Sequence, residues 1–262
     1  MSDRRSETWR WLAVPAGGAA ASVALHAVAP SVPAPPLLGY VVAFAAISGL
    51  TLAGAQTCPA RTTRDLRWLV GPLGCLALIA WSGGRDVWHA AAVLACLLMA
   101  GGLVGSVVGT SIEHAGHLLF VAIVSSLADA ASVLHPSGPS AAIVESEQAL
   151  SLLALPFAFL GTAETPPLLG VGDVVFVALY AAAGRRHGLP VWRTMLALAA
   201  AFALTMATVM VFELPVPALP FLGFAMLSAH PEARRPPAAD LRRGMLVIGA
   251  LVLALVGLWL SR

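Results

Sequence analysis

The sequence contains no lysine, and only 11% of its 262 residues are charged. A soluble domain has about a quarter of its residues charged. Hydrophobic residues make up 59% of the chain and fall in long runs. Many of these runs reach the roughly 17 to 25 residues that a helix needs to cross a bilayer. The scarcity of charge therefore excludes an ordinary soluble domain, and we expect an all-α, polytopic membrane protein.

Cysteine and metal-binding motifs are also scarce. Cys58, Cys75 and Cys96 lie in apolar sequence, so we interpret them as small core residues and not as a disulfide framework. The zinc-protease motif HExxH and the GxSG motif of rhomboid-type serine proteases are absent. The segment SIEHAGH, residues 111–117, offers too few clear metal ligands. We expect no metal or cofactor, and the lack of a basic stripe with interleaved aromatics argues against nucleic-acid binding.

Apolar runs between charged or proline-rich breaks predict about nine membrane-spanning helices. They lie near residues 10–29, 37–55, 67–82, 87–110, 115–134, 168–184, 190–212, 215–229 and 242–260. The first run is interpreted as a retained helix and not as a cleaved signal peptide, because its apolar part is long enough to span. We expect the segment 140–161 to be interfacial or partly inserted, since its apolar stretch ALSLLALPFAFLG has only 13 residues.

The arginines predict the orientation. With nine spans, 13 of the 15 arginines fall on one side, and only Arg85 and Arg262 fall on the other. Counting 140–161 as a further span would give an unbiased split of 7 against 8. Because positive charge accumulates on the cytoplasmic side, we expect a cytoplasmic N-terminus in a prokaryotic inner membrane. The C-terminus and the connection 135–167 would then face outside.

Two aspartates lie inside predicted spans. Asp129 is found in LLFVAIVSSLADAASVL, and Asp173 in LLGVGDVVFVALY. A carboxylate within a span is costly and by default marks a functional site with a partner. Asp129 precedes Pro136 by seven residues and Asp173 follows Pro167 by six, which places both roughly 10 Å below the outer surface. Because consecutive antiparallel helices are usually neighbours, we expect the two carboxylates to meet.

The residues around the pair leave several interpretations open. The carboxylates can serve as interhelical packing contacts or as a proton or cation path. Gly170 and Gly172 remove side chains next to Asp173, which allows close approach to that carboxylate. The three prolines of ELPVPALPF, residues 213–221, prevent an intact helix there. Such a break survives at membrane depth only beside protein or a water-filled cavity.

These pieces, in this order, resemble the GxGD aspartyl intramembrane proteases, the family of presenilin and the signal peptide peptidases. The resemblance covers roughly residues 115–229. In the family, the second catalytic aspartate lies in a G-x-G-D motif, followed later by a Pro-Ala-Leu motif. The matching residues are Asp129, Gly170-Val171-Gly172-Asp173 and Pro217-Ala218-Leu219. The segment after Asp129, with Pro136-x-Gly138-Pro139 and Val144-Glu145, is also similar to presenilin.

The resemblance implies a presenilin-like catalytic core with a broken Pro-Ala-Leu helix. It divides the chain into N-terminal helices (1–112), a catalytic core (113–229) and a C-terminal helix (230–262). Catalysis would fall to Asp129 and Asp173, which hydrolyse peptide bonds within transmembrane helices without metal, cofactor or accessory subunits. The residues implied in substrate binding are Gly170, Val171, Gly172, Pro217, Ala218 and Leu219. With the predicted orientation, the expected partners are type II helices or signal-peptide remnants, and membrane lipid.

The chain departs from the family pattern in three places. Ala128 stands where the family usually has tyrosine. Four spans precede the Asp129 helix where presenilin has five, and one span follows the Pro-Ala-Leu segment. Prepilin-type peptidases also carry GxGD, but no zinc-binding cysteine set accompanies it here. An inactive homologue and a proton-coupled transporter or channel remain alternatives, although the inverted repeats typical of transporters are not found.

Overall fold

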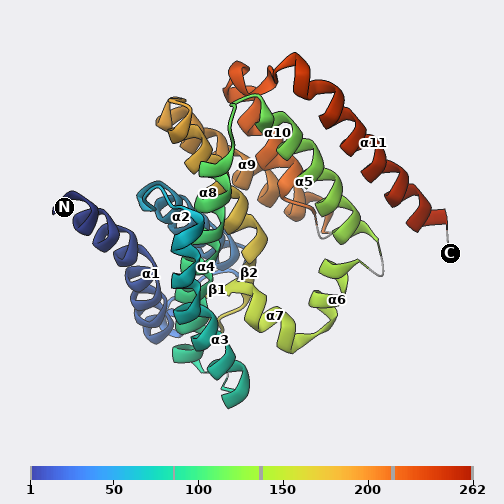
Figure 1. Ribbon diagram of the computed structural model, residues 1–262. Coiled ribbons are helices and arrows are strands. Elements are labelled where there is room, and N and C mark those ends of the chain that lie inside the picture. The colour runs from blue at the N-terminus through green and yellow to red at the C-terminus, as the bar shows by residue number, and fades with distance from the viewer. Residues whose placement is uncertain (1, 85, 136–137, 214–215, 261–262) are drawn as a thin grey trace. The chain divides into compact units, whose positions relative to one another are not determined.

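The computed structural model describes residues 2–84, 86–135, 138–213 and 216–260. Within these residues the chain is helical throughout, apart from loops and one sheet of two short strands (Figure 1). Pro136, Pro215, Arg85 and Arg262, on which parts of the sequence analysis rest, lie outside the described residues. The chain forms two compact units. The first comprises Met1–Ser111 and Ile143–Ala182, and the second Ile112–Ala142 and Ala183–Arg262.

Helix α4 (Val87–Ser111) is the centre of the first unit. Helices α1, α2 and α3 and strand β1 pack against it. In its most apolar stretch 72% of the residues are buried, compared with 17% to 33% in the other candidate spans. This enclosure explains why α4 is apolar on all sides. The other elements are α1 (Ser2–Val28), η1 (Ala29–Ser31), α2 (Pro36–Thr57), η2 (Thr63–Leu69), α3 (Val70–Ser82), α7 (Glu147–Leu153), β1 (Ala154–Pro156) and β2 (Pro167–Gly170).

Helix α10 is the short central helix of the second unit, and it packs along α5 and α9 (Figure 1). The buried side chains of Thr194 and His230 are hydrogen-bonded at 2.9 Å, which ties the start of α9 to the end of α10. The elements of this unit are α5 (His117–Leu134), α9 (Val191–Phe212), α10 (Leu219–Ala229), η3 (Pro231–Arg234) and α11 (Ala238–Leu260). Helices α6 (Pro139–Glu145) and α8 (Val171–Arg186) each begin in one unit and end in the other.

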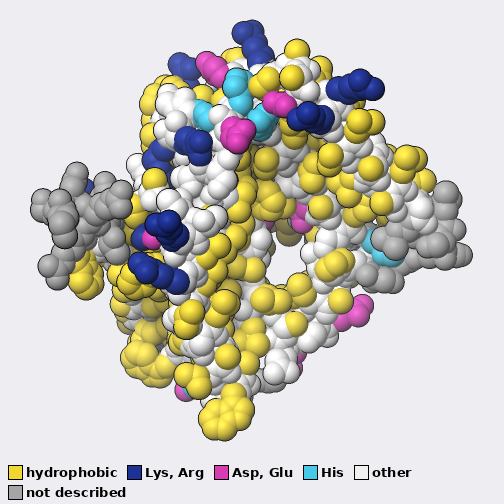
Figure 2. All heavy atoms as spheres, viewed as in Figure 1, with side chains coloured by type: hydrophobic (Ala, Val, Ile, Leu, Met, Phe, Trp, Pro, Cys, Tyr) yellow, Lys and Arg dark blue, Asp and Glu magenta, His cyan; other side chains and the backbone are white. Residues whose placement is uncertain are grey.

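Five described helices are long and apolar enough to cross a membrane. These are α1 with its extension to Ser31, α2, α4, α5 and α9, and each corresponds to a predicted span. Hydrophobic side chains cover much of the visible face in Figure 2, which fits a membrane-embedded protein. Helices α3, α8 and α10 have 13, 16 and 11 residues. They are shorter than the roughly 20 residues of a standard span, so the count of nine spans stays a prediction.

Two helices near the motifs begin three and four residues later than the approximate boundaries predicted from the sequence. The span expected at 168–184 starts too early, because residues 168–170 belong to β2 and the helix begins at Val171. A short apolar run such as LLG fits a buried strand as well as a helix. The helix expected from 215 begins only at Leu219. As predicted, 140–161 contains no spanning helix, since α6, α7 and β1 have at most seven residues each.

Three glycines of α4 are spaced four residues apart and make a close contact with another helix. They are Gly101, Gly105 and Gly109, and they face the backbone of α8 within the first unit. A Cβ atom at Gly105 would overlap the carbonyl oxygen of Val175, and one at Gly109 would overlap that of Leu179. Small residues at such positions let two helix backbones approach closely. The start of α8, which carries Asp173, is therefore held against the central helix of its unit.

We expect Gly105→Ala to destabilise the first unit by about 1 to 3 kcal/mol, because an added methyl group must push two backbones apart. Thermal unfolding in detergent measures the loss. Gly49→Ala in α2 is the matched control, since a Cβ atom there meets nothing within 4 Å. Equal melting temperatures for the two variants would contradict the close packing of α4 and α8.

Candidate active site

Asp129 lies in the last third of α5 and is partly buried. Its Oδ2 atom accepts a hydrogen bond from the backbone N–H of Leu219 at 2.9 Å. Leu219 is the first residue of α10 and the last residue of the Pro-Ala-Leu motif. The bond joins two segments that are 90 residues apart in the sequence. Asp129 and the Pro-Ala-Leu motif, which the sequence shows only as separate features, are therefore in contact.

The local sequence around the Pro-Ala-Leu motif explains why an N–H group is available there. Pro217 and Ala218 are not helical, and α10 starts directly after them. The first N–H groups of a helix have no partner within that helix and lie at the positive end of its dipole. A carboxylate is a suitable acceptor at this position. Asp129 thus satisfies a backbone donor that the break in the chain leaves open.

Hydrogen bonds connect the end of α5 with the start of α6. The N–H of Gly138 donates to the carbonyl of His135 at 2.7 Å. The Ser132 hydroxyl accepts from the N–H of Ser140 at 3.0 Å and is hydrogen-bonded to its hydroxyl at 2.7 Å. A Cβ atom at Gly138 would overlap the carbonyl oxygen of Ser132, so glycine is required here. Gly138 and Pro139 belong to the segment whose sequence resembles presenilin.

Asp173 is the third residue of α8, which directly follows strand β2. It is partly buried, and its Oδ2 atom accepts a hydrogen bond from the N–H of Gly170 at 3.2 Å. A Cβ atom at Gly172 would meet nothing within 4 Å, and one at Gly170 would lie 3.5 Å from Asp173 Oδ2. Within the described residues, packing therefore does not require either glycine. Their effect is to leave the surroundings of the Asp173 carboxylate open.

The strand before Asp173 belongs to a small antiparallel sheet. Ala154 pairs with Gly170 and Leu155 with Leu169, and the register shifts before Pro156 meets Pro167. Leu155 and Leu169 are buried. Proline has no backbone N–H, so regular pairing stops at that end. In this sheet of two strands, β2 has only β1 as a partner, and β1 rests on α4.

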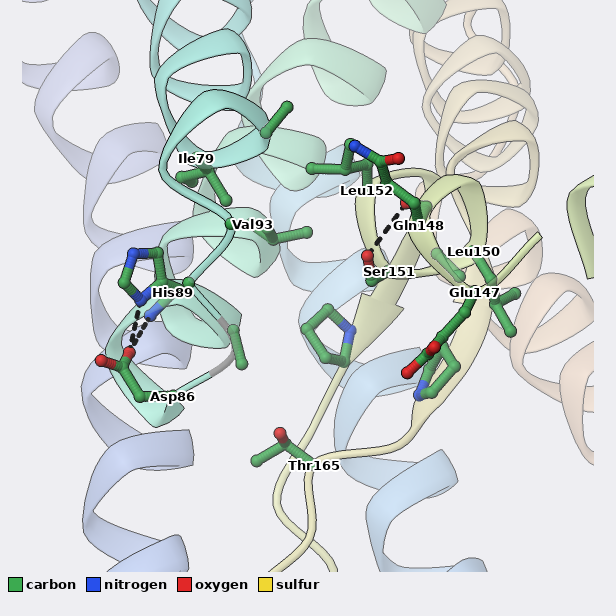
Figure 3. A pocket seen from close by; sticks show the side chains of 17 residues that line it. Ile79, Asp86, His89, Val93, Glu147, Gln148, Leu150, Ser151, Leu152 and Thr165 are labelled. Atoms are coloured by element: carbon green, nitrogen blue, oxygen red, sulfur yellow. Dashed lines mark hydrogen bonds and ion pairs between the residues drawn. The ribbon is translucent and has the colours of Figure 1, made fainter.

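A cavity of about 360 Å³ lies beside the two strands in the first unit (Figure 3). Its lining includes Asp86 and His89 near the start of α4, and Glu147 and Gln148 from α7. Asp86 Oδ1 lies 2.6 Å from His89 Nδ1 and also accepts the backbone N–H of His89 at 2.9 Å. That backbone N–H is the main reason why the pKa of Asp86 is lowered. The strand that leads to Asp173 therefore has at its side a mostly apolar cavity whose lining includes a few charged and polar side chains.

The predicted site residues fall into two groups. Asp129, Pro217, Ala218 and Leu219 belong to the second unit, while Gly170, Val171, Gly172 and Asp173 belong to the first. Each group is assembled within its own unit, and the meeting of the two carboxylates stays a prediction. Sequence reasoning missed the role of the Leu219 N–H, because a backbone donor has no side-chain signature. It also missed the cavity, for which the Asp86-x-x-His89 spacing at a helix start was the available signal.

Within the described residues, no group of three or more histidine, cysteine, aspartate or glutamate side chains is placed to hold a metal ion. Comparison with known protein families, curated proteins and solved structures finds no match to this chain. The function must therefore be argued from the motifs and the geometry of each unit.

The contact between Asp129 and Leu219 predicts the exchange rate of one backbone amide. In Asp129→Ala the Leu219 amide should exchange with deuterium about five-fold faster, because a hydrogen bond of about 1 kcal/mol is lost. Asp129→Asn keeps an acceptor oxygen and should retain most of the protection. The Leu222 amide, which bonds to the Ala218 carbonyl, is the internal control. Residue-resolved exchange mass spectrometry measures the rates. Equal exchange at Leu219 in wild type, Asp129→Ala and Asp129→Asn would contradict the contact.

Proposed function

We propose that this chain is an intramembrane aspartyl protease of the GxGD type, with Asp129 and Asp173 as its catalytic pair. The observation that supports this best is the hydrogen bond from Leu219 to Asp129. The first aspartate and the Pro-Ala-Leu motif are separate signals in the sequence, yet the fold brings them into one contact. A proline-rich loop without a function is not expected to end in a hydrogen bond to that carboxylate.

The second motif supports the proposal independently. Asp173 follows a strand and two glycines, and the N–H of Gly170 orients its carboxylate. A carboxylate used only for packing needs no open space beside it. The space at Gly172 suits a carboxylate that must be approached by another chain and by water. The two motifs thus supply one oriented carboxylate each.

The proposed mechanism uses both carboxylates and a water molecule. Two carboxylates at close range share one proton. The ionised aspartate takes a proton from water, which attacks the scissile carbonyl, while the protonated aspartate donates its proton to the carbonyl oxygen. The initially ionised aspartate, now protonated, then donates its proton to the departing amine, and the other takes the proton of a gem-diol hydroxyl, which restores the starting state of the pair. The roles belong to the coupled pair and are not assigned to one residue. No step requires a metal or a cofactor.

A helical substrate must unwind before attack, because its carbonyl groups are hydrogen-bonded within the helix. Strand β2 ends at Gly170, three residues before Asp173, and has a single partner in its sheet. An unwound substrate can pair with it as an added strand, in the way that many peptides add to a sheet edge. In this proposal Val171 and Gly172 contact the substrate just before Asp173. Pro217 and Ala218, the non-helical residues before Leu219, contact the substrate near Asp129.

Catalysis is tested with the purified protein and fluorescent transmembrane peptides in liposomes. Wild type should cut within the hydrophobic segment, and Asp129→Asn and Asp173→Asn should each lose at least about a hundred-fold in rate, since general acid–base catalysis contributes that much or more. Asp240→Asn is a matched control, because Asp240 pairs with His117 at a helix start and not with either motif.

Other results would favour the alternatives. Wild type that neither cuts any peptide nor binds an aspartyl-protease transition-state analogue would contradict the protease and favour an inactive homologue. If proton flux through the liposomes then depended on Asp129 and Asp173, the carboxylates would belong to a transporter or channel.

The proposed orientation places the connection 135–167 outside and the arginine-rich loops in the cytoplasm, so that substrates have a cytoplasmic N-terminus. Ala163 and Thr63 are exposed residues in two loops expected on opposite sides. In a cysteine-free background, Ala163→Cys in spheroplasts should react with a membrane-impermeant maleimide, and Thr63→Cys only after lysis. The reverse labelling pattern would overturn the orientation and the type II substrate class.

A further inference from the structure

A second cavity in the first unit lies among α1, η2, α3 and α4. Its volume is about 440 Å³, which is within the roughly 300 to 1,000 Å³ of sites that hold small organic ligands. None of its lining residues belongs to the candidate active site. Its lining includes Trp9, Trp11, Arg61, Trp68, Met99 and Leu103.

Arg61 gives this cavity one fixed positive charge. Its guanidinium carbon lies 4.9 Å from the centre of the Trp11 ring, and Trp11 itself is buried. The Nε atom of Arg61 is buried and has no hydrogen-bond partner among the described residues. A guanidinium is always charged and its N–H groups act only as donors. A buried N–H without an acceptor is rare in folded proteins, so the site lacks an acceptor that a ligand can supply.

The chemistry of the surroundings favours an anionic oxygen atom as that acceptor. The nearby carboxylate of Asp65 accepts hydrogen bonds from the N–H and the hydroxyl of Thr62 through its Oδ2 atom, and it is close enough to Arg61 for an electrostatic interaction, but it makes no hydrogen bond to the Arg61 Nε atom. The bonds from Thr62 are the main reason why the pKa of Asp65 is lowered. Arg64 and Arg67, on the same short helix η2, are exposed and add positive charge. Arginine recognises phosphate oxygens with particular geometric fit.

The rest of the cavity is apolar and has the features of a membrane interface. Leu103 is fully buried and Met99 is partly buried, and both belong to α4 in the floor. Trp9 and Trp68 are 64% and 60% exposed, although both line the cavity. Exposed tryptophans of this kind sit at the headgroup level of membranes, where basic pockets between helices bind anionic lipid headgroups. The matching ligand has an anionic head and an apolar tail.

We propose that this cavity binds an anionic phospholipid, with its phosphate at Arg61 and an acyl chain between the tryptophans and α4. A zwitterionic lipid would bring an opposing positive charge to the arginines of η2. A free phosphate would leave the apolar floor unfilled. The charge of the site and its apolar depth together select the anionic lipid. The inference does not depend on the proposed protease activity.

The test uses the full-length protein in mild detergent, titrated with phosphatidylglycerol or with phosphatidylcholine of the same acyl chains, with bound lipid counted by native mass spectrometry. Wild type should retain phosphatidylglycerol at least about five-fold more tightly, which is the effect expected of one basic side chain at an anionic headgroup. Arg61→Gln should lose this preference. Arg61→Lys keeps the positive charge and should retain part of the preference for phosphatidylglycerol. This variant therefore distinguishes an effect of the charge from an effect of misfolding.

Arg193→Gln is the matched control. Arg193 also lies over a tryptophan ring, that of Trp192 at 5.3 Å, but both residues are exposed. This variant should bind phosphatidylglycerol like wild type. Equal retention of the two lipids by wild type, or an unchanged preference in Arg61→Gln, would overturn the proposal. Displacement of bound phosphatidylglycerol by inorganic phosphate at matched concentration would also overturn it, because it would show an anion site without a role for the acyl chain.

Discussion

A backbone N–H or C=O group that leaves a helix inside a membrane must find a partner within the protein, because hydrocarbon offers none. Under the predicted topology, this constraint applies to the segments around both aspartates. The chain leaves helical geometry before Asp173, where β2 pairs with β1. It does so again before α10, where the carboxylate of Asp129 accepts the N–H of Leu219. Each irregular segment is thus stabilised by a specific hydrogen bond, and each bond lies within a few residues of a carboxylate.

Helix α4 provides the rigid support for one of these segments. Its glycines bring α8 to backbone distance, and β1 packs on the same helix. Asp173 therefore lies in the chain between β2, whose partner β1 packs on α4, and the part of α8 that contacts the glycines of α4. Functional groups need such support, because a small displacement of a reacting group is costly in rate. The open space at Gly172 lies next to a backbone that has little freedom to move, so access to the carboxylate does not require a flexible site.

The sequence predicts features that depend on local composition better than those that depend on distant pairing. The helix positions follow from apolar runs, and the contact of Gly101, Gly105 and Gly109 follows from a four-residue spacing. In contrast, β1 and β2 are short and apolar, and their pairing joins residues on either side of a loop. The run PLLG, which forms β2, is too short to show the hydrophobic periodicity that distinguishes a strand from a helix. The donor to Asp129 is a main-chain group 90 residues away, which no pattern of side chains can reveal.

The length of β2 has a consequence for any helix that pairs with it. The strand has four residues, and a residue rises about 3.3 Å in a strand but 1.5 Å in a helix. A transmembrane segment that exchanges four helical residues for extended ones therefore grows by about 7 Å, against a hydrocarbon thickness of about 30 Å. A segment that is too short for the bilayer gains a better match as it unwinds, whereas one that already fits must tilt or push its ends into water. Under the proposed function, bilayer thickness and substrate length act together as a selection criterion, independent of the residues around the scissile bond.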